Sequence, residues 1–247
     1  MKIMKSLLLV VGAFVAMSAA QAAEVRLLCS NGMKTVVEQV QAGWEKSSGH
    51  KLVIEYSSAQ TLKKEIAEGK AFDAAILTVD VANELAKDGK LAAGPKLIAR
   101  GGVGIGVRKG AAKPDMKSPD GLKKFLLNAK SIAYTANGAS RPAIDKMFEK
   151  MGIAAAVKSK LQLTGPSEAP ERVAAGQAEV VLTLVSEILP IAGVELVGPL
   201  PAEHQGYVSF SAAMAAKPMQ AGAAKQFLDY LASPAIVDVL KSKGLER

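Results

Sequence analysis

The stretch KLVIEYSSAQTLKKEIAEGKAFDAAILTVD, residues 51–80, decides the fold that the sequence predicts. It begins and ends with apolar runs rich in β-branched residues. Between these runs, Leu62, Ile66 and Ala67 form an apolar stripe at helical spacing, and Gly69 is typical of a helix end. Strand, helix and strand in this order predict a parallel sheet with helices on its faces.

Ser57 and Ser58 stand where this predicted helix begins. In parallel sheets, ligands bind outside the carboxyl ends of the strands, against the N-termini of the helices that follow. The two hydroxyl groups therefore stand where an anion would be held. The alternative is that they do no more than cap the helix.

The first 23 residues predict a secretory signal peptide. They combine a lysine-containing start, an apolar segment over residues 7–15 and the cleavage pattern Ala-Gln-Ala at residues 20–22. No later stretch has 18 uninterrupted apolar residues, so we expect no membrane span in the exported chain. The sequence thus predicts a secreted protein that begins at Ala23 or Glu24.

The formal net charge of +8 comes from lysines and arginines that are spread along the chain. Aromatic and basic residues do not interleave as they do on a nucleic-acid platform, so we expect no nucleic-acid partner. The simplest interpretation of this charge is a basic surface in contact with solvent. The functional alternative is that the positive charge attracts anions weakly.

Cys29 is the one cysteine of the sequence and cannot form an internal disulfide. It lies in the apolar run VRLLCS, which favours a buried, hydrophobic role over that of a reactive thiol.

The pattern of residues 51–80 extends in both directions. Residues 24–80 predict a β-α-β-α-β unit, and residues 106–193 repeat the same plan. Two segments, 97–107 and 193–207, predict crossings between the units. The alternating glycines of the first crossing do not predict a dinucleotide loop, because no helix opens after them. A strand over residues 208–214 and two closing helices complete the chain.

The predicted fold class is therefore α/β, with two lobes that close on a ligand like a clamshell. Each lobe has a mainly parallel sheet flanked by helices, and two crossovers join them. We assign residues 24–100 and 206–247 to lobe 1 and residues 101–205 to lobe 2. Hinges are expected near residues 100–106 and 198–205.

Several motifs together resemble a known family. They are Ser57-Ser58-x-x-Thr61-Leu62, Glu68-Gly69 followed by Asp73, Arg172-Val173-Ala174-Ala175-Gly176, and Phe227-Leu228-Asp229-Tyr230-Leu231 followed by Ser233-Pro234. Over nearly all of residues 24–247 the sequence resembles periplasmic solute-binding proteins, specifically the molybdate-binding branch of the type 2 class. The resemblance implies a monomer that binds an oxyanion without metal or cofactor and delivers it to an ABC permease.

The sequence departs from the molybdate-binding pattern at positions that matter for the ligand. Gly32 and Ala59 stand where that branch presents hydroxyl groups, and Leu184 stands at the place of a tyrosine. Arg141 adds a charge to a loop of the second lobe. Its guanidinium suits a carboxylate or another oxyanion, and a solvated residue at a helix start is the alternative.

The predicted ligand site combines residues that follow strands and precede helices in both lobes. Its members are Ser30, Asn31, Gly32, Ser57, Ser58, Ala59, Ser140, Arg141, Ala169 and Leu184. The predicted ligand is a small anion, either a molybdate-like oxyanion or a small organic carboxylate. No metal site is expected.

Catalytic patterns are missing from the sequence, and we expect a protein that is not an enzyme. His50 and His204 are isolated, and no HExxH, GxSxG or Cys-His arrangement occurs. Asp73 and Asp80 end strands and suggest no acid–base role. A ligand-presenting sensor would have the same fold as a transport component, and the sequence does not separate them.

Overall fold

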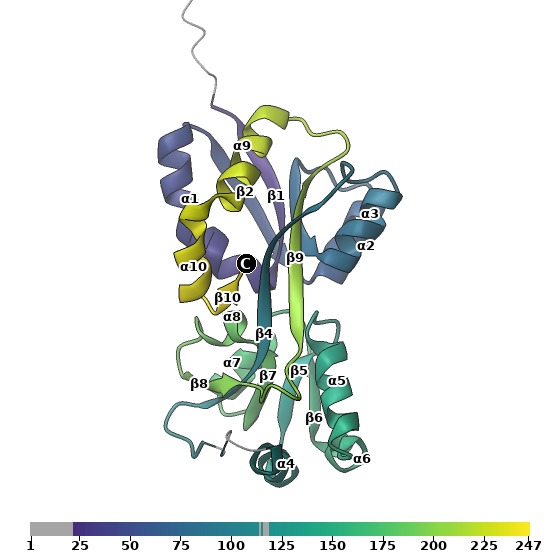
Figure 1. Cartoon of the computed structure of the whole chain (residues 1–247), viewed down its shortest axis with the longest axis vertical. Helices are drawn as coiled ribbons and strands as arrows, with labels where there is room; N and C mark the ends of the chain where they lie inside the picture. The colour runs from purple at the N-terminus through teal and green to yellow at the C-terminus, as the bar shows by residue number, and fades with distance from the viewer. Residues whose placement is uncertain (1–21, 114, 116–118) are drawn as a thin grey trace, which may run out of the picture.

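The computed structural model describes residues 22–113, 115 and 119–247, so most of the predicted signal peptide lies outside the described residues. Two groups of strands and helices lie one above the other, and two long strands run between them (Figure 1). In the part of the chain described, no helix has the length and apolar character needed to cross a membrane.

The first group surrounds three parallel strands in the order β2-β1-β3. These strands are β1 (Glu24–Ser30), β2 (Lys51–Ser57) and β3 (Ala74–Thr78). Their helices are η1 (Asn31–Met33), α1 (Lys34–Ser48), α2 (Ala59–Ala67), α3 (Val79–Lys87), α9 (Ala221–Ala232), η3 (Pro234–Ile236) and α10 (Val237–Ser242). The predicted strand–helix–strand unit over residues 51–80 is confirmed.

The second group repeats this plan around three parallel strands in the order β7-β5-β6. These strands are β5 (Ile132–Thr135), β6 (Leu161–Thr164) and β7 (Val180–Leu184). Their helices are α4 (Pro119–Asn128), α5 (Arg141–Lys150), α6 (Ala154–Val157), η2 (Lys158–Lys160), α7 (Glu168–Ala174) and α8 (Val185–Ile188). Most apolar residues of each group pack against the strands of the same group.

One long strand, β4 (Lys96–Arg108), belongs to both sheets, and antiparallel pairs make both sheets mixed. It pairs antiparallel with β9 (Tyr207–Met214) and β10 (Leu245–Glu246) in the first sheet. Its second half pairs antiparallel with β7 and β8 (Val194–Pro199) in the second sheet. The sheets were expected to be mainly parallel, and the parallel part is limited to three strands in each, β2-β1-β3 and β7-β5-β6, which reach the sheet edge at β2 and β6. The segment predicted as a plain crossing, 193–207, contains strand β8.

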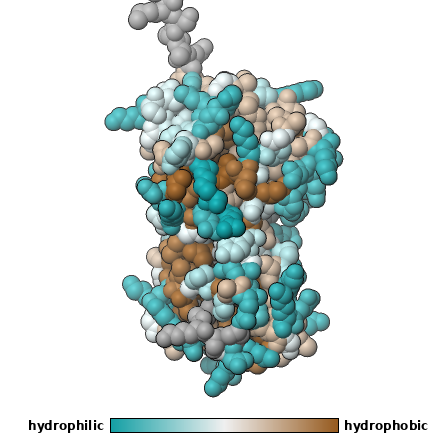
Figure 2. All heavy atoms as spheres, in the orientation of Figure 1, coloured by the Kyte–Doolittle hydropathy of each residue, from teal (hydrophilic) through white to brown (hydrophobic). Residues whose placement is uncertain are grey.

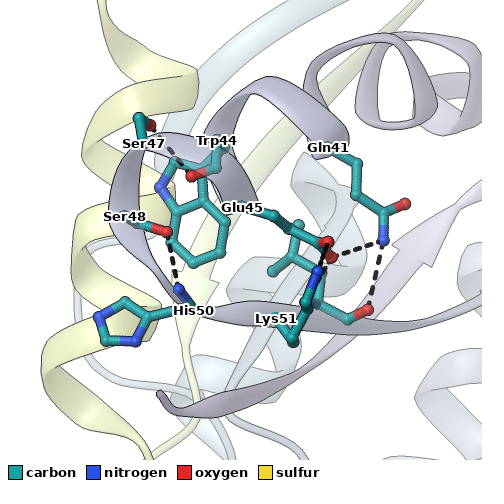
Figure 3. A network of polar contacts seen from close by, with 8 residues as sticks. Gln41, Trp44, Glu45, Ser47, Ser48, His50 and Lys51 are labelled. Atoms are coloured by element: carbon teal, nitrogen blue, oxygen red, sulfur yellow. Dashed lines mark hydrogen bonds and ion pairs between the residues drawn. The ribbon is translucent and has the colours of Figure 1, made fainter. Parts of the chain in front are cut away.

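The end of α1 is held by a carboxylate, as Figure 3 shows. Glu45 accepts hydrogen bonds from the Leu52 backbone N–H at 3.0 Å, from Gln41 at 3.0 Å and from the Lys51 ammonium at 2.7 Å. These hydrogen bonds, that of Leu52 first, lower the pKa of Glu45 to about 2. The contact ties the helix to the start of β2, after the helix has ended at Gly49 with a φ of 74°.

Asp73 connects three segments of the first group. Its fully buried carboxylate accepts hydrogen bonds from the backbone N–H groups of Arg26, Met219 and Gln220, at 2.9, 2.7 and 2.8 Å. Three donors satisfy a charge that burial would otherwise make costly. Asp73 thereby fixes β1 and the start of α9 against the sheet, which is a structural role.

Candidate functional site

Two adjoining cavities lie where the two groups of elements meet. The inner cavity has a volume of about 20 Å³ and the outer cleft about 670 Å³. Ala59, Gly138 and Ala139 line both, so the cavities share a wall. Figure 2 shows the molecule narrowing between its upper and lower halves, with apolar side chains gathered on both sides of this waist.

The first group contributes the ends of β1 and β2 to the inner cavity. Ser30, Asn31 and Gly32 follow β1, and Ser58 follows β2. The Ser58 hydroxyl accepts a hydrogen bond from the Thr61 backbone N–H at 3.1 Å and lies 2.8 Å from the Thr61 hydroxyl. Ser58 therefore caps α2 and lines the cavity as well, so the two interpretations of this residue are compatible.

The second group contributes the ends of all three of its parallel strands. Thr135 ends β5, Ser167 follows β6, and Leu184 ends β7. Ser167 has a φ of 63°, and it is the one non-glycine residue with positive φ among the described residues. Such a conformation costs of order 1 kcal/mol and persists only where the surroundings hold it. The Ser167 loop is thus held in a strained conformation at the cavity.

The two groups touch directly beside the inner cavity. The Ser186 hydroxyl donates a hydrogen bond of 2.9 Å to the Gly32 carbonyl. A Cβ atom at Gly32 would lie 2.4 Å from Cζ of Phe210 and 2.8 Å from Cδ1 of Leu184. Leu184 belongs to the second sheet but packs in the core cluster of the first. This close approach explains why position 32 is glycine, although the molybdate-binding branch presents a hydroxyl group there.

Glu187 is the one ionisable side chain around the inner cavity in the part of the chain that the structure describes. The Thr183 hydroxyl donates a hydrogen bond to its carboxyl group. Burial raises the pKa of Glu187, against the opposing effect of hydrogen bonds from Thr183 and from the Leu184 backbone N–H. The inner cavity thus combines neutral donors with a single, partly buried carboxyl group.

Arg141 lies at the wall of the outer cleft and is partly engaged by its own surroundings. Its Nε donates to Asp145 at 3.3 Å and its Nη1 donates to the Ala136 carbonyl at 2.6 Å. The Tyr134 hydroxyl donates to the other oxygen of Asp145 at 3.0 Å. These contacts orient the guanidinium, and Nη2 donates to none of the described residues.

The family model for bacterial extracellular solute-binding proteins matches residues 25–246. The chain belongs to this family. It is 27% identical to the molybdate-binding protein ModA of Azotobacter vinelandii, over 96% of both chains. It is 25% identical to the aconitate isomerase of a Pseudomonas species, over 89% of this chain and 86% of that protein.

Among solved structures, the periplasmic molybdate-binding protein of Azotobacter vinelandii matches with a TM-score of 0.78. The match has 18% sequence identity and covers 90% of this chain and 99% of that one. The predicted two-lobed fold of the type 2 class and the resemblance to its molybdate-binding branch are therefore confirmed.

The structure of this solute-binding protein brings together most of the predicted site. Six of the predicted residues line the inner cavity, namely Ser30, Asn31, Gly32, Ser58, Ala59 and Leu184. Arg141 lines the outer cleft, and Ser57, Ser140 and Ala169 line neither. Ala169 is fully buried in a core cluster of the second group, and Ser140 is buried at the start of α5.

Sequence reasoning left Thr135, Ser167 and Glu187 out of the predicted site. All three lie at or just after the carboxyl end of a strand, which is the rule that selected the other residues. Applying this rule to every strand of the second unit would have found them.

Two further observations bear on the chemistry. The described residues contain no group of three His, Cys, Asp or Glu side chains placed to hold a metal ion. Cys29 is buried, and burial raises the pKa of its thiol, which disfavours the reactive thiolate.

Proposed function

We propose that this protein captures a small anion between its two lobes and delivers it to an ABC importer. The observation that carries this proposal is the inner cavity, where hydroxyl and amide groups from the ends of several strands meet. Each hydrogen bond to a charged ligand contributes roughly 1.5–3 kcal/mol. Asn31, Ser30 and Thr135 are the side-chain donors that we assign to the anion.

The export of the chain, its division into lobes and its state of association belong to the same proposal. Residues 1–23 would direct the chain to the periplasm, where it would act as a monomer. Lobe 1 would comprise residues 24–100 and 206–247, and lobe 2 residues 101–205. The lobes would close by bending near residues 100–106 and 198–205.

The dimensions of the site favour an anion that carries an organic body. The inner cavity, at about 20 Å³, slightly exceeds the ~10–15 Å³ that one water needs, so it suits one compact group. The outer cleft, at about 670 Å³, falls in the range of roughly 300–1,000 Å³ typical of small-molecule sites. Arg141 at its wall provides a cation for a second acidic group.

A thermal-shift screen tests the capture of an anion. It would compare molybdate, sulfate and phosphate with succinate, citrate and cis-aconitate. A ligand at 100 times its Kd stabilises the folded protein by about 2.7 kcal/mol. We expect a polycarboxylate to give the largest shift. If no anion raises the melting temperature, the proposed capture is wrong.

A second candidate function is the isomerisation of an unsaturated polycarboxylate. The carboxyl group of Glu187, at the inner cavity, would repel an anion when ionised, so a simple anion carrier gains nothing from it. One relative is named an aconitate isomerase, and its reaction class requires a proton-transfer group. The expectation that the chain is not an enzyme therefore stays a prediction.

A further inference from the structure

Glu187 differs from the other side chains around the inner cavity in being able to accept and return a proton. It lines the inner cavity on one side and a second cavity of about 220 Å³ on the other. The hydrogen bond from Thr183 fixes one carboxyl oxygen. As the third residue of α8, Glu187 also faces the backbone N–H of the residue that caps this helix, Leu184. Capping explains one hydrogen bond but not the position of the carboxyl group at the cavity.

Few charged groups surround Glu187. Lys34 and Glu38 of α1 and Glu171 of α7 line the second cavity with it. Lys34 and Glu38 lie 3.9 Å apart as an ion pair, so their charges offset each other. None of these three residues lines the inner cavity. The carboxyl group of Glu187 is therefore the group that meets a ligand there.

We propose that Glu187 transfers a proton between two carbons of an unsaturated polycarboxylate bound across the inner cavity and the outer cleft. This inference rests on the anion capture proposed above and assigns the catalytic residue of the second candidate function. The substrate class is a small di- or tricarboxylate whose methylene group lies between a carboxylate and a carbon–carbon double bond.

The proposed reaction balances without a cofactor. The ionised Glu187 takes a proton from the methylene carbon, and the C–H electron pair spreads over the allylic carbons and the adjacent carboxylate. The protonated Glu187 then returns this proton to the far allylic carbon. The double bond has moved by one position, and the enzyme has regained its starting state.

The neighbouring groups suit this chemistry. Negative charge grows on the substrate carboxylate during proton removal, and the neutral donors Ser30, Asn31 and Thr135 line the same cavity. Arg141, at the wall of the outer cleft, would hold a distal carboxylate. Burial raises the pKa of Glu187, which brings a carboxylate closer to the basicity that a general base needs near neutral pH.

The test follows cis-aconitate in D₂O by proton NMR with the full mature chain. We expect the methylene signal to decay and the trans isomer to appear. Since a general base contributes roughly 10²–10⁴-fold, Glu187→Gln should slow both changes by about a hundredfold or more. Glu187→Asp should retain part of the rate. Glu171→Gln is the matched control, because it removes a carboxylate from the neighbouring cavity only, and its rate should equal that of the wild type.

Binding and folding are measured on the same samples. Melting temperature checks that Glu187→Gln is folded, and saturation-transfer NMR checks that it still binds cis-aconitate. Binding by the wild type without exchange or isomerisation overturns the catalytic role and leaves anion capture intact. Failure of cis-aconitate to bind overturns the substrate class, and the thermal-shift screen then decides separately whether another anion is captured. Equal exchange rates in wild type and Glu187→Gln overturn the assignment of Glu187.

Discussion

Asp73 and Glu187 are acidic side chains of the two lobes in opposite situations. Three backbone N–H groups surround the Asp73 carboxylate, and all belong to segments that it holds together. Around Glu187, one hydroxyl group and one backbone N–H oppose the effect of burial, and a cavity lies beside it. The difference teaches that a carboxylate whose hydrogen bonds all come from the fold, as in Asp73, has a structural role, whereas the carboxyl group of Glu187 still borders a cavity, as the proposed proton transfer requires.

The largest effect is expected for Asp73→Ala, which would break the structural side of this comparison. The substitution leaves three backbone N–H groups without their acceptor, each at a cost of about 1–3 kcal/mol. The free energy of unfolding from urea titration should fall by at least about 3 kcal/mol. Asp80→Ala, at an exposed position of α3, serves as the control and should change it by less than about 1 kcal/mol. Equal losses in both variants would contradict the role given to Asp73.

The next effect concerns the ligand side of the comparison. Arg141→Ala should weaken the binding of a polycarboxylate by about ten- to hundredfold in calorimetry, at about 1.4 kcal/mol per decade. Its effect on the binding of molybdate should be small, because we expect the neutral donors of the inner cavity to hold a compact anion, and Arg141 lines only the outer cleft. A similar loss for both ligands would place Arg141 in the structure of the lobe and not in ligand recognition.

Glu45 is a third case, a carboxylate that accepts three hydrogen bonds, like Asp73, but lies near solvent. Hydrogen bonds lower its pKa to about 2, below the ordinary value of 4.5. Its stabilising contribution is therefore present above about pH 4.5 and is lost as the pH falls toward 2. Glu45→Gln should reduce the free energy of unfolding by about 1 kcal/mol at pH 7, and the difference should shrink at pH 3.

The control for this prediction is Glu38→Gln, at an exposed position 3.9 Å from Lys34. Its free energy of unfolding should match that of the wild type at both pH values within about 0.5 kcal/mol. If Glu45→Gln behaves like this control, its hydrogen bonds carry no net stability.

The smallest effect on stability is expected for Glu187→Gln, at the functional side of the comparison. A raised pKa means that the ionised form is disfavoured in the folded state. The folded protein therefore becomes less stable as the pH rises through the folded-state pKa of Glu187. The amide can still accept the hydrogen bond from Thr183. Calorimetry between pH 5 and 8 should show a melting temperature equal to or above that of the wild type. A large drop would make Glu187 a structural residue like Asp73.

Particular elements show what the sequence could predict. The apolar runs of residues 51–80 and the helix end at Gly69 were enough to predict the parallel strands β2 and β3 and the helix between them. Local sequence pattern and tertiary fold agree in this stretch. Strand β8 was missed because Gly198 and Pro199 favoured a crossing without regular structure, although an edge strand tolerates both residues.

The candidate site shows the limit of such prediction. Position after a strand selected Ser30, Asn31 and Ser58, which line the inner cavity. The same rule selected Ala169, whose small side chain is buried where α7 packs on the sheet. The rule also covers Glu187, three residues after the end of β7, but it does not show which of the residues after a strand reach the cavity. That depends on how the lobes approach each other, as in the contact between Ser186 and Gly32, which lie 154 positions apart.

The continuous strand β4 has a consequence for folding cooperativity. Its first half exchanges hydrogen bonds with β9 and β10, and its second half with β7 and β8, so neither sheet keeps its ladder if the strand comes out. Opening of one lobe therefore also breaks the pairing of β4 in the other, so the opening does not stay local. Amide hydrogens of β4 should exchange with solvent only through global unfolding. The two lobes should melt as one thermodynamic unit, although each has a core cluster of its own.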